Sequence, residues 1–88
     1  MKESKVEKYL VKQVKLEGGQ VRKVRFLDRR GAPDRVIFFP DGEIWWVELK
    51  APGKKAEAHQ KREHKRMAKM GQQVVVLDSL EAVDRFLT

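Results

Sequence analysis

The 88-residue sequence contains no cysteine, which excludes disulfide bonds and cysteine-based zinc sites. It also lacks the long apolar run that a membrane-spanning helix needs, and its first residues form a charged segment rather than a signal peptide. We therefore expect a cytosolic protein. Repeats and linkers are absent as well, so the pattern predicts a single domain, 1–88, whose modest core a partner subunit would help to stabilise.

Positive charge is what the chain has in excess, with 20 Lys and Arg against 13 acidic residues and a net charge of +7. A small basic protein favours polyanions such as DNA, RNA or an anionic membrane, although a basic surface can also serve solubility alone. The residues that could contact a nucleic-acid backbone are Arg29, Arg30, Lys54, Lys55, Lys61, Arg62, Lys65 and Arg66. For those on a helix, a solvated face is the alternative.

Hydrophobic periodicity predicts an α/β fold with the element order αβββαβα. The predicted helices cover residues 3–17, 55–70 and 79–87, and the predicted strands cover 21–27, 34–39, 43–50 and 74–77. Glycines at 18–19 and 71 end the first two helices, and Met67 and Met70 mark the inner side of the second. The last strand–helix–strand unit implies a parallel crossover, and hence a mixed four-stranded sheet flanked by helices.

A hairpin between the second and third strands sets the register of the candidate site. Pro40-Asp41-Gly42 suits a type I turn followed by a glycine in the left-handed conformation, which would pair Phe39 with Glu43. Counting outward, Asp34 then falls opposite Glu48, and Lys50 lies on the same face. Trp45 and Trp46 point to opposite faces, so at least one of them belongs to the core.

Two carboxylates and a lysine at one end of a hairpin suit a divalent cation beside a phosphate. Mg²⁺ prefers oxygen ligands and is typically held by one or two carboxylates, here Asp34 and Glu48, to which the Leu49 carbonyl could be added. Lys50 would position water and stabilise charge in the transition state, or act as a general base if neutral. The alternatives are a solvated turn Asp, an edge Glu and a surface lysine.

Two further polar residues lie at the edge of apolar helix faces. Glu7 falls between Val11 and Val14, from where it could reach the metal site, although such a residue is usually solvated. Gln60 is predicted to point inward, toward a substrate phosphate or a water. His59 and His64 are five residues apart, which does not stack them as a metal pair, so phosphate contact or solvation is the prediction.

These motifs resemble the PD-(D/E)XK nuclease signature, with Pro33-Asp34 as its opening dipeptide and Glu48-Leu49-Lys50 as its second half. More narrowly, the chain resembles the VRR-Nuc family almost from end to end. The matching segments are the helix with Glu7, then Gly18-Gly19, residues 30–35, residues 47–54, Gln60 and Gly71. Ala32 stands where a valine is frequent in the family. A D…ExK pattern alone would be a weak signal, whereas this combination is specific.

The resemblance implies a restriction-endonuclease-like core and phosphodiester cleavage that depends on Mg²⁺ or Mn²⁺. It assigns metal binding to Asp34 and Glu48 with Glu7 as an additional ligand, catalysis to Lys50, and the polar position on the following helix to Gln60. Stand-alone phage and bacterial members resemble Holliday-junction resolvases, which implies a homodimer acting on branched DNA in the cytoplasm of a bacterial or phage-infected cell. The alternatives are a nicking or restriction-like nuclease without junction preference, and a non-catalytic nucleic-acid-binding module.

Overall fold

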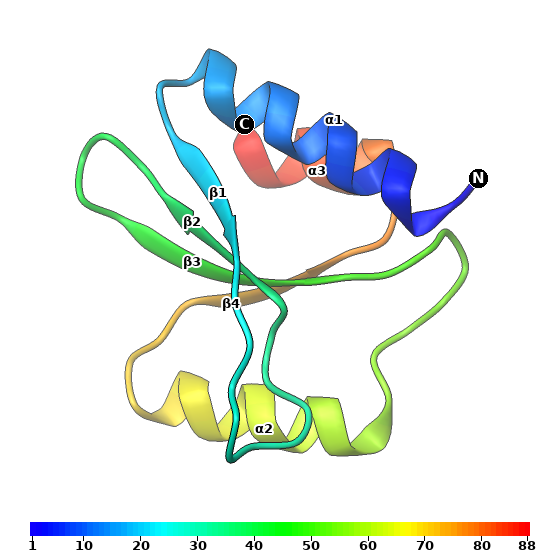
Figure 1. The fold of residues 1–88 in the computed structure, drawn as a ribbon, viewed down its shortest axis with the longest axis vertical. Helices are drawn as coiled ribbons and strands as arrows, with labels where there is room; N and C mark the ends of the chain where they lie inside the picture. The colour runs from blue at the N-terminus through cyan, green and yellow to red at the C-terminus, as the bar shows by residue number, and fades with distance from the viewer.

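The computed structural model describes all residues 1–88 and has the predicted α/β architecture (Figure 1). The elements are α1 (Glu3–Leu16), β1 (Gln20–Lys23), β2 (Arg35–Phe38), β3 (Ile44–Leu49), α2 (Ala58–Lys69), β4 (Val74–Leu77) and α3 (Leu80–Leu87). The strands form one mixed sheet in the order β1-β2-β3-β4, antiparallel except for the parallel pair β3–β4. None of the three helices is long and apolar enough to cross a membrane.

The β2–β3 hairpin has the predicted register. Phe38 pairs with Ile44, and the Phe39 N–H donates to the Glu43 carbonyl at 2.9 Å. Gly42 has a φ of 91°, the left-handed conformation that the three-residue loop requires. The turn residues therefore fix which side chains of the two strands face each other along the hairpin.

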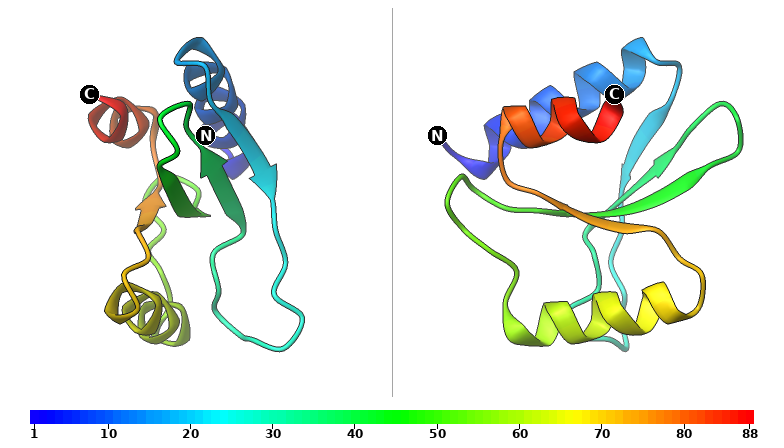
Figure 2. Two further views of the ribbon diagram at one scale, coloured as in Figure 1. Left: turned by 90° about the vertical axis from the view of Figure 1, so that its left-hand side faces the viewer. Right: turned by 180° about the vertical axis from the view of Figure 1, so that it is seen from behind.

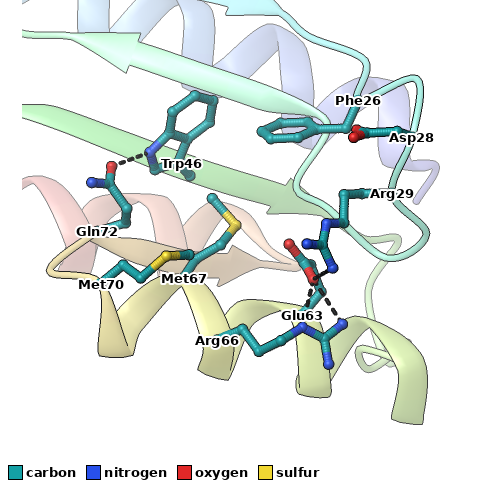
Figure 3. Close-up of a pocket in the computed structure, with 9 residues that line it drawn as sticks. All are labelled: Phe26, Asp28, Arg29, Trp46, Glu63, Arg66, Met67, Met70 and Gln72. Carbon is teal, nitrogen blue, oxygen red and sulfur yellow. Dashed lines mark hydrogen bonds and ion pairs between the residues drawn. The ribbon is translucent and has the colours of Figure 1, made fainter.

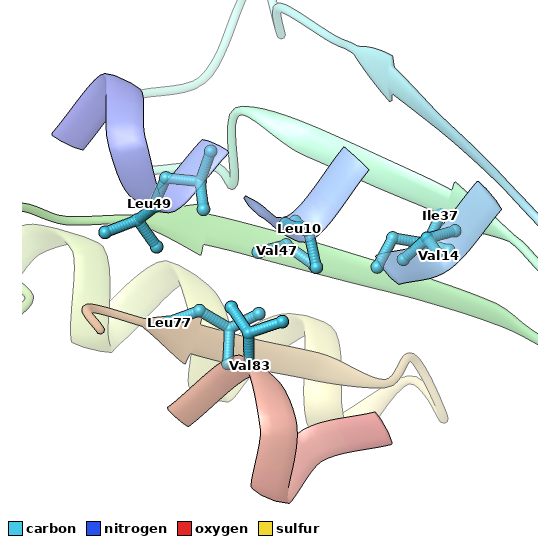
Figure 4. Close-up of a cluster of buried hydrophobic side chains, with 8 residues drawn as sticks. Leu10, Val14, Ile37, Val47, Leu49, Leu77 and Val83 are labelled. Carbon is cyan, nitrogen blue, oxygen red and sulfur yellow. The ribbon is translucent and has the colours of Figure 1, made fainter. Parts of the chain in front are cut away.

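The three helices divide unequally between the two faces of the sheet. Helices α1 and α3 lie side by side on one face and α2 covers the other (Figures 1 and 2). The buried apolar cluster lies on the α1/α3 side (Figure 4). Its members are Val6, Leu10, Val14, Ile37, Val47, Leu49, Leu77 and Val83. Most of the hydrophobic core thus lies on this face, whereas the α2 side adds only Val36 and Met67 to the buried hydrophobic residues.

Three predictions about the secondary structure need correction. Strand β1 ends at Lys23, and residues 24–34 form a loop instead of continuing the strand to 27. Helix α2 begins at Ala58 rather than at 55, because the Glu57 and Gln60 side chains and backbones form a capping box there. Met70 is the C-cap of α2 and is 70% exposed, so it does not belong to the buried side that Met67 marks.

Candidate active site

Asp34 and Glu48 lie at the end of the β2–β3 hairpin on the face that α2 covers. The observed register, continued by one residue, places them directly opposite each other. Because Phe39 and Glu43 form a hydrogen-bonded pair, the alternation along the ladder makes 34–48 a non-hydrogen-bonded pair. Such pairs bring Cα atoms to about 4.5 Å, the closest approach in an antiparallel ladder. The two carboxylates are therefore neighbours on one face.

Glu48 is the most strongly perturbed ionisable group of this site. Its residue is only 6% exposed, and burial, followed by the nearby charge of Asp34, raises its pKa to about 7. The positive charges of Lys50 and Arg35 act in the opposite direction but do not cancel the effect. The Lys50 ammonium lies 4.0 Å from Glu48 Oε2, at the limit of an ion pair. The buried Glu48 carboxyl therefore holds its proton more tightly than an exposed glutamate does.

Asp34 is held from two sides. Its Oδ1 accepts a hydrogen bond from the Leu49 N–H at 3.3 Å, and its Oδ2 lies 3.3 Å from Nη1 of Arg35. The N–H and C=O of one strand residue point to the same side, so the Leu49 carbonyl is also directed toward β2. Its register partner would be Pro33, which has no N–H to donate. The Leu49 carbonyl thus faces the site without a ladder donor from Pro33.

Glu7 is the partner of Arg35. Nε of Arg35 donates to Glu7 Oε2 at 2.7 Å, and Nη2 contacts the same oxygen. Arg35 therefore bridges Glu7, on the α1 side, and Asp34, on the α2 side. No three His, Asp or Glu side chains of the chain lie close enough together to hold a metal ion. A role for Glu7 as an additional ligand stays a prediction.

Gln60 lies in the first turn of α2, where its Oε1 accepts a hydrogen bond from the Glu57 N–H at 2.9 Å. The loop that leads to Asp34 passes directly over this turn. A Cβ atom at Gly31 would come within 2.7 Å of the His59 carbonyl oxygen, and Gly31 has a φ of 83°. Only glycine allows this approach. Gln60 is thus half-buried beneath the loop, and its contact with substrate stays a prediction.

The predicted nucleic-acid-binding cations separate into groups. Lys54 and Lys55, from the segment before α2, and Lys61 of α2 line a hollow of about 410 Å³ that His64 also borders. Arg29 and Arg66 lie on either side of Glu63, at 3.9 Å and 2.7 Å from its Oε1 (Figure 3). Arg30, Arg62 and Lys65 are exposed to solvent. These cations lie on α2 and on the segments that flank the site.

One residue of α2, Glu63, escaped the sequence interpretation, and His64 is less solvated than one of its two predicted roles requires. Glu63 is 4% exposed, and the Nε2 atom of His64 is buried without a hydrogen-bond partner. Burial is the main cause of a lowered pKa at His64, and the Lys50 charge acts in the same direction. The position of Glu63 was a usable signal, because Gln60, Glu63 and Met67 follow each other at intervals of three and four residues along one helix face.

Comparisons with known proteins identify relatives that match nearly the whole chain. No family model matches the chain. The protein named "Putative nuclease p44" from Acyrthosiphon pisum secondary endosymbiont phage 1 is 47% identical over 79 residues, which cover 90% of this chain and 85% of that protein. A solved structure described as a VRR_NUC domain superimposes with a TM-score of 0.89 at 41% identity, covering 97% of this chain and 92% of the other. On this similarity over nearly the whole chain, the protein belongs to the VRR-Nuc family.

Proposed function

We propose that this protein is a structure-selective DNA endonuclease that hydrolyses phosphodiester bonds with the help of Mg²⁺ or Mn²⁺. The phage relative is named as a nuclease, and the family membership supports the same activity here. The observation that carries the proposal is the pair Asp34–Glu48, opposed on one face with Lys50 beside it. The site residues are Asp34, Glu48 and Lys50, with Gln60 at the adjacent helix turn.

The donor groups of the site fit a hard divalent cation. Two carboxylates and the Leu49 carbonyl offer oxygen ligands, the kind that Mg²⁺ and Mn²⁺ prefer. Burial and the adjacent charge of Asp34 raise the pKa of Glu48 to about 7, and a bound cation would favour its ionised form. When bound, such an ion would screen the phosphate charge, orient a water and neutralise the leaving oxygen.

The chain's own groups have distinct tasks in this proposal. Asp34 is kept in place by the Leu49 N–H and Arg35, so it needs little reorganisation when the site is filled. The Lys50 ammonium lies 4.0 Å from Glu48. There it would stabilise the negative charge that develops on the phosphate oxygens in the transition state. The lysines of the hollow beside His64 would hold phosphates that flank the scissile one.

The proposed substrate is branched DNA, a four-way junction cut by a homodimer. A domain of this size offers one such site, and a two-fold dimer would present two sites related by the same symmetry as the junction strands. The alternative within the same chemistry is a nicking or restriction-like nuclease without junction preference. The cytoplasm of a bacterial or phage-infected cell is the proposed location, in line with the phage origin of the relative.

The test is to incubate the purified protein with a labelled four-way junction, a flap and a linear duplex, each with Mg²⁺, with Mn²⁺ or with EDTA. We expect paired, symmetric incisions in the junction only when metal is present, and no cleavage by Glu48→Gln. Equal cleavage of the linear duplex would favour the nicking alternative. Binding without any cleavage would contradict the nuclease proposal and favour a non-catalytic module. Sedimentation of the protein alone and bound to the junction tests the dimer.

A further inference from the structure

A second hollow on the α2 side has no role in the chemistry described so far. It lies between the loop after β1, the middle of β3 and the second half of α2 (Figure 3), and its volume is about 340 Å³. It is lined by Phe26, Asp28, Arg29, Trp46, Glu63, Arg66, Met67, Met70 and Gln72. We refer to it below as the Phe26/Trp46 groove.

Four of the nine residues that line the Phe26/Trp46 groove are hydrophobic and form its apolar part, namely Phe26, Trp46, Met67 and Met70. The rings of Phe26 and Trp46 meet edge to face with centroids 5.6 Å apart, and the indole N–H of Trp46 is already bonded to the Gln72 side chain at 2.9 Å. Met67 closes the bottom, whereas Met70 is 70% exposed at the rim. Aromatic rings and polarisable thioethers offer the kind of surface on which a nucleobase stacks.

The charge of the groove distinguishes it from a second aromatic hollow on the opposite face of the sheet. That hollow is formed around Trp45 and Phe86, and its charged lining residues are three carboxylates, Glu17, Asp41 and Glu43. The Phe26/Trp46 groove instead carries two arginines, Arg29 and Arg66, beside two carboxylates, Asp28 and the buried Glu63 that both arginines contact. Two arginines beside an apolar slot suit a base together with its phosphate, whereas the acidic hollow would repel it.

The position of the groove relates it to the candidate active site. Trp46 and Glu48 are two residues apart on the same face of β3, which corresponds to roughly 6.6 Å along the strand. Successive bases of one DNA strand rise by about 3.4 Å. A base in the groove would therefore belong to a nucleotide within about two positions of the phosphate at Glu48.

We propose that the Phe26/Trp46 groove binds one unpaired nucleobase of the DNA substrate, next to the scissile phosphate. The proposal rests on the nuclease function proposed above and adds the feature that the protein would recognise. A base in a continuous duplex is stacked on both sides and cannot enter, so occupancy requires a nucleotide that has left the stack, as at a branch point. The groove would thus select branched DNA over linear duplex.

The first test removes single bases from the DNA and leaves the groove of the protein unchanged. Single abasic sites are placed at each of three nucleotides on either side of the mapped cut in a branched DNA. Affinity is measured by fluorescence anisotropy with Mg²⁺ in a Lys50→Ala background, in which turnover is slowed. We expect one position, within about two nucleotides of the cut, where loss of the base weakens binding on the order of tenfold. Equal affinity for all positions would overturn the proposal.

The second test changes the groove with matched controls. Met70→Glu places a carboxylate at the exposed rim, and Leu16→Glu makes the same change at a residue of α1 that is 73% exposed on the other side of the sheet. Phe26→Ala removes one wall, and Leu27→Ala alters the neighbouring side chain, which is 89% exposed and does not line the groove. We expect only the groove variants to weaken binding and to abolish the effect of the abasic site.

Folding is checked by circular dichroism, and Met70→Glu keeps the test valid if Phe26→Ala is unstable, because Met70 is mostly exposed. Equal loss of DNA affinity in Met70→Glu and Leu16→Glu would show a general effect of charge and contradict base binding in the groove. If the wild type cleaves DNA in the presence of metal but abasic sites do not change its affinity, base binding in the groove is refuted and the nuclease function is not. Absence of both DNA binding and cleavage would refute the two proposals together.

Discussion

The two faces of the sheet differ in what they bury. The α1/α3 face buries an all-apolar cluster that includes Leu10, Ile37 and Val83, each with no exposed surface. The α2 face buries two carboxylates, Glu48 at 6% and Glu63 at 4% exposure, beside the apolar Val36 and Met67. Isolated buried charges are costly, so a fold tolerates them only where another part supplies the stability. The contrast indicates that the α1/α3 face contributes most of the hydrophobic stabilisation, whereas the α2 face holds the carboxylates of the proposed site.

The neighbouring residues Trp45 and Trp46 show the same division within one strand. Trp45 packs edge to face on Phe86 of α3, with centroids 5.1 Å apart, at the margin of the core. Trp46 faces the α2 side and lines the groove that contains two arginines. Because successive side chains of a strand point to opposite faces of the sheet, two adjacent tryptophans have different surroundings.

The largest effect on activity is expected from Lys50→Ala on the α2 face. Removing its charge should slow cleavage by about 10²–10³-fold while the protein still binds metal and DNA. Single-turnover cleavage of labelled DNA at pH 8 measures the effect, with Lys12→Ala, an exposed lysine of α1, as the control. Near-normal cleavage by Lys50→Ala would remove this residue from the mechanism.

Leu10→Ala should show the opposite pattern, because it opens a cavity in the apolar cluster. Loss of a buried leucine side chain typically lowers the free energy of unfolding by about 2–5 kcal/mol. Urea unfolding followed by circular dichroism measures this loss, and cleavage per folded molecule should change little. A Leu10→Ala protein that is stable but inactive would contradict this separation of stability and activity between the two faces.

Glu48→Gln should stabilise the metal-free protein at alkaline pH. Because the pKa of Glu48 is raised from 4.5 to about 7, the folded state binds this proton more tightly than the unfolded state does. Stability from this group is therefore complete below pH 4.5 and is lost as pH rises through 7, by up to about 3 kcal/mol. Urea unfolding in EDTA should show a gain for the variant at pH 8 that disappears near pH 4.5. An equal difference at both pH values would contradict the raised pKa.

The combined variant Lys61→Ala, Arg62→Ala, Lys65→Ala should weaken DNA binding without regard to sequence. If each side chain contacts one phosphate, the slope of log affinity against log salt should become shallower by up to about 3. Anisotropy titrations over a range of salt concentrations measure this slope, and a triple alanine change at Lys5, Lys8 and Lys12 of α1 is the control. Unaltered binding at low salt would place the DNA on another surface.

Local signals made most of the fold predictable from the sequence. The turn Pro40-Asp41-Gly42 was sufficient to fix the hairpin register and hence the opposition of Asp34 and Glu48. Gly18 and Gly71, both at positive φ, end α1 and α2 where expected, and the N–H groups that follow bond back to the last turn. Each of these features depends on only a few neighbouring residues.

The features that the sequence interpretation missed depend on contacts between distant segments. The loop of residues 24–34 leaves the sheet to pass over α2, where Gly31 meets the His59 backbone, and no local pattern indicates that contact. Glu7 of α1 pairs with Arg35 of β2, a residue 28 positions away in the sequence. The buried Glu63 pairs with Arg66 and Arg29, and only Arg66 is its neighbour along the helix.

Binding of Mn²⁺ to the wild type, Asp34→Asn and Glu48→Gln, measured by isothermal titration calorimetry at pH 6 and pH 8, tests most directly whether the α2 face carries a metal-dependent site. We expect the wild type to bind Mn²⁺ more tightly at pH 8 than at pH 6, because Glu48, with its pKa of about 7, must lose its proton before it can bind the metal. We expect Asp34→Asn and Glu48→Gln to lose Mn²⁺ binding. Equal Mn²⁺ affinity of the wild type and both variants would contradict a metal site at the end of the hairpin.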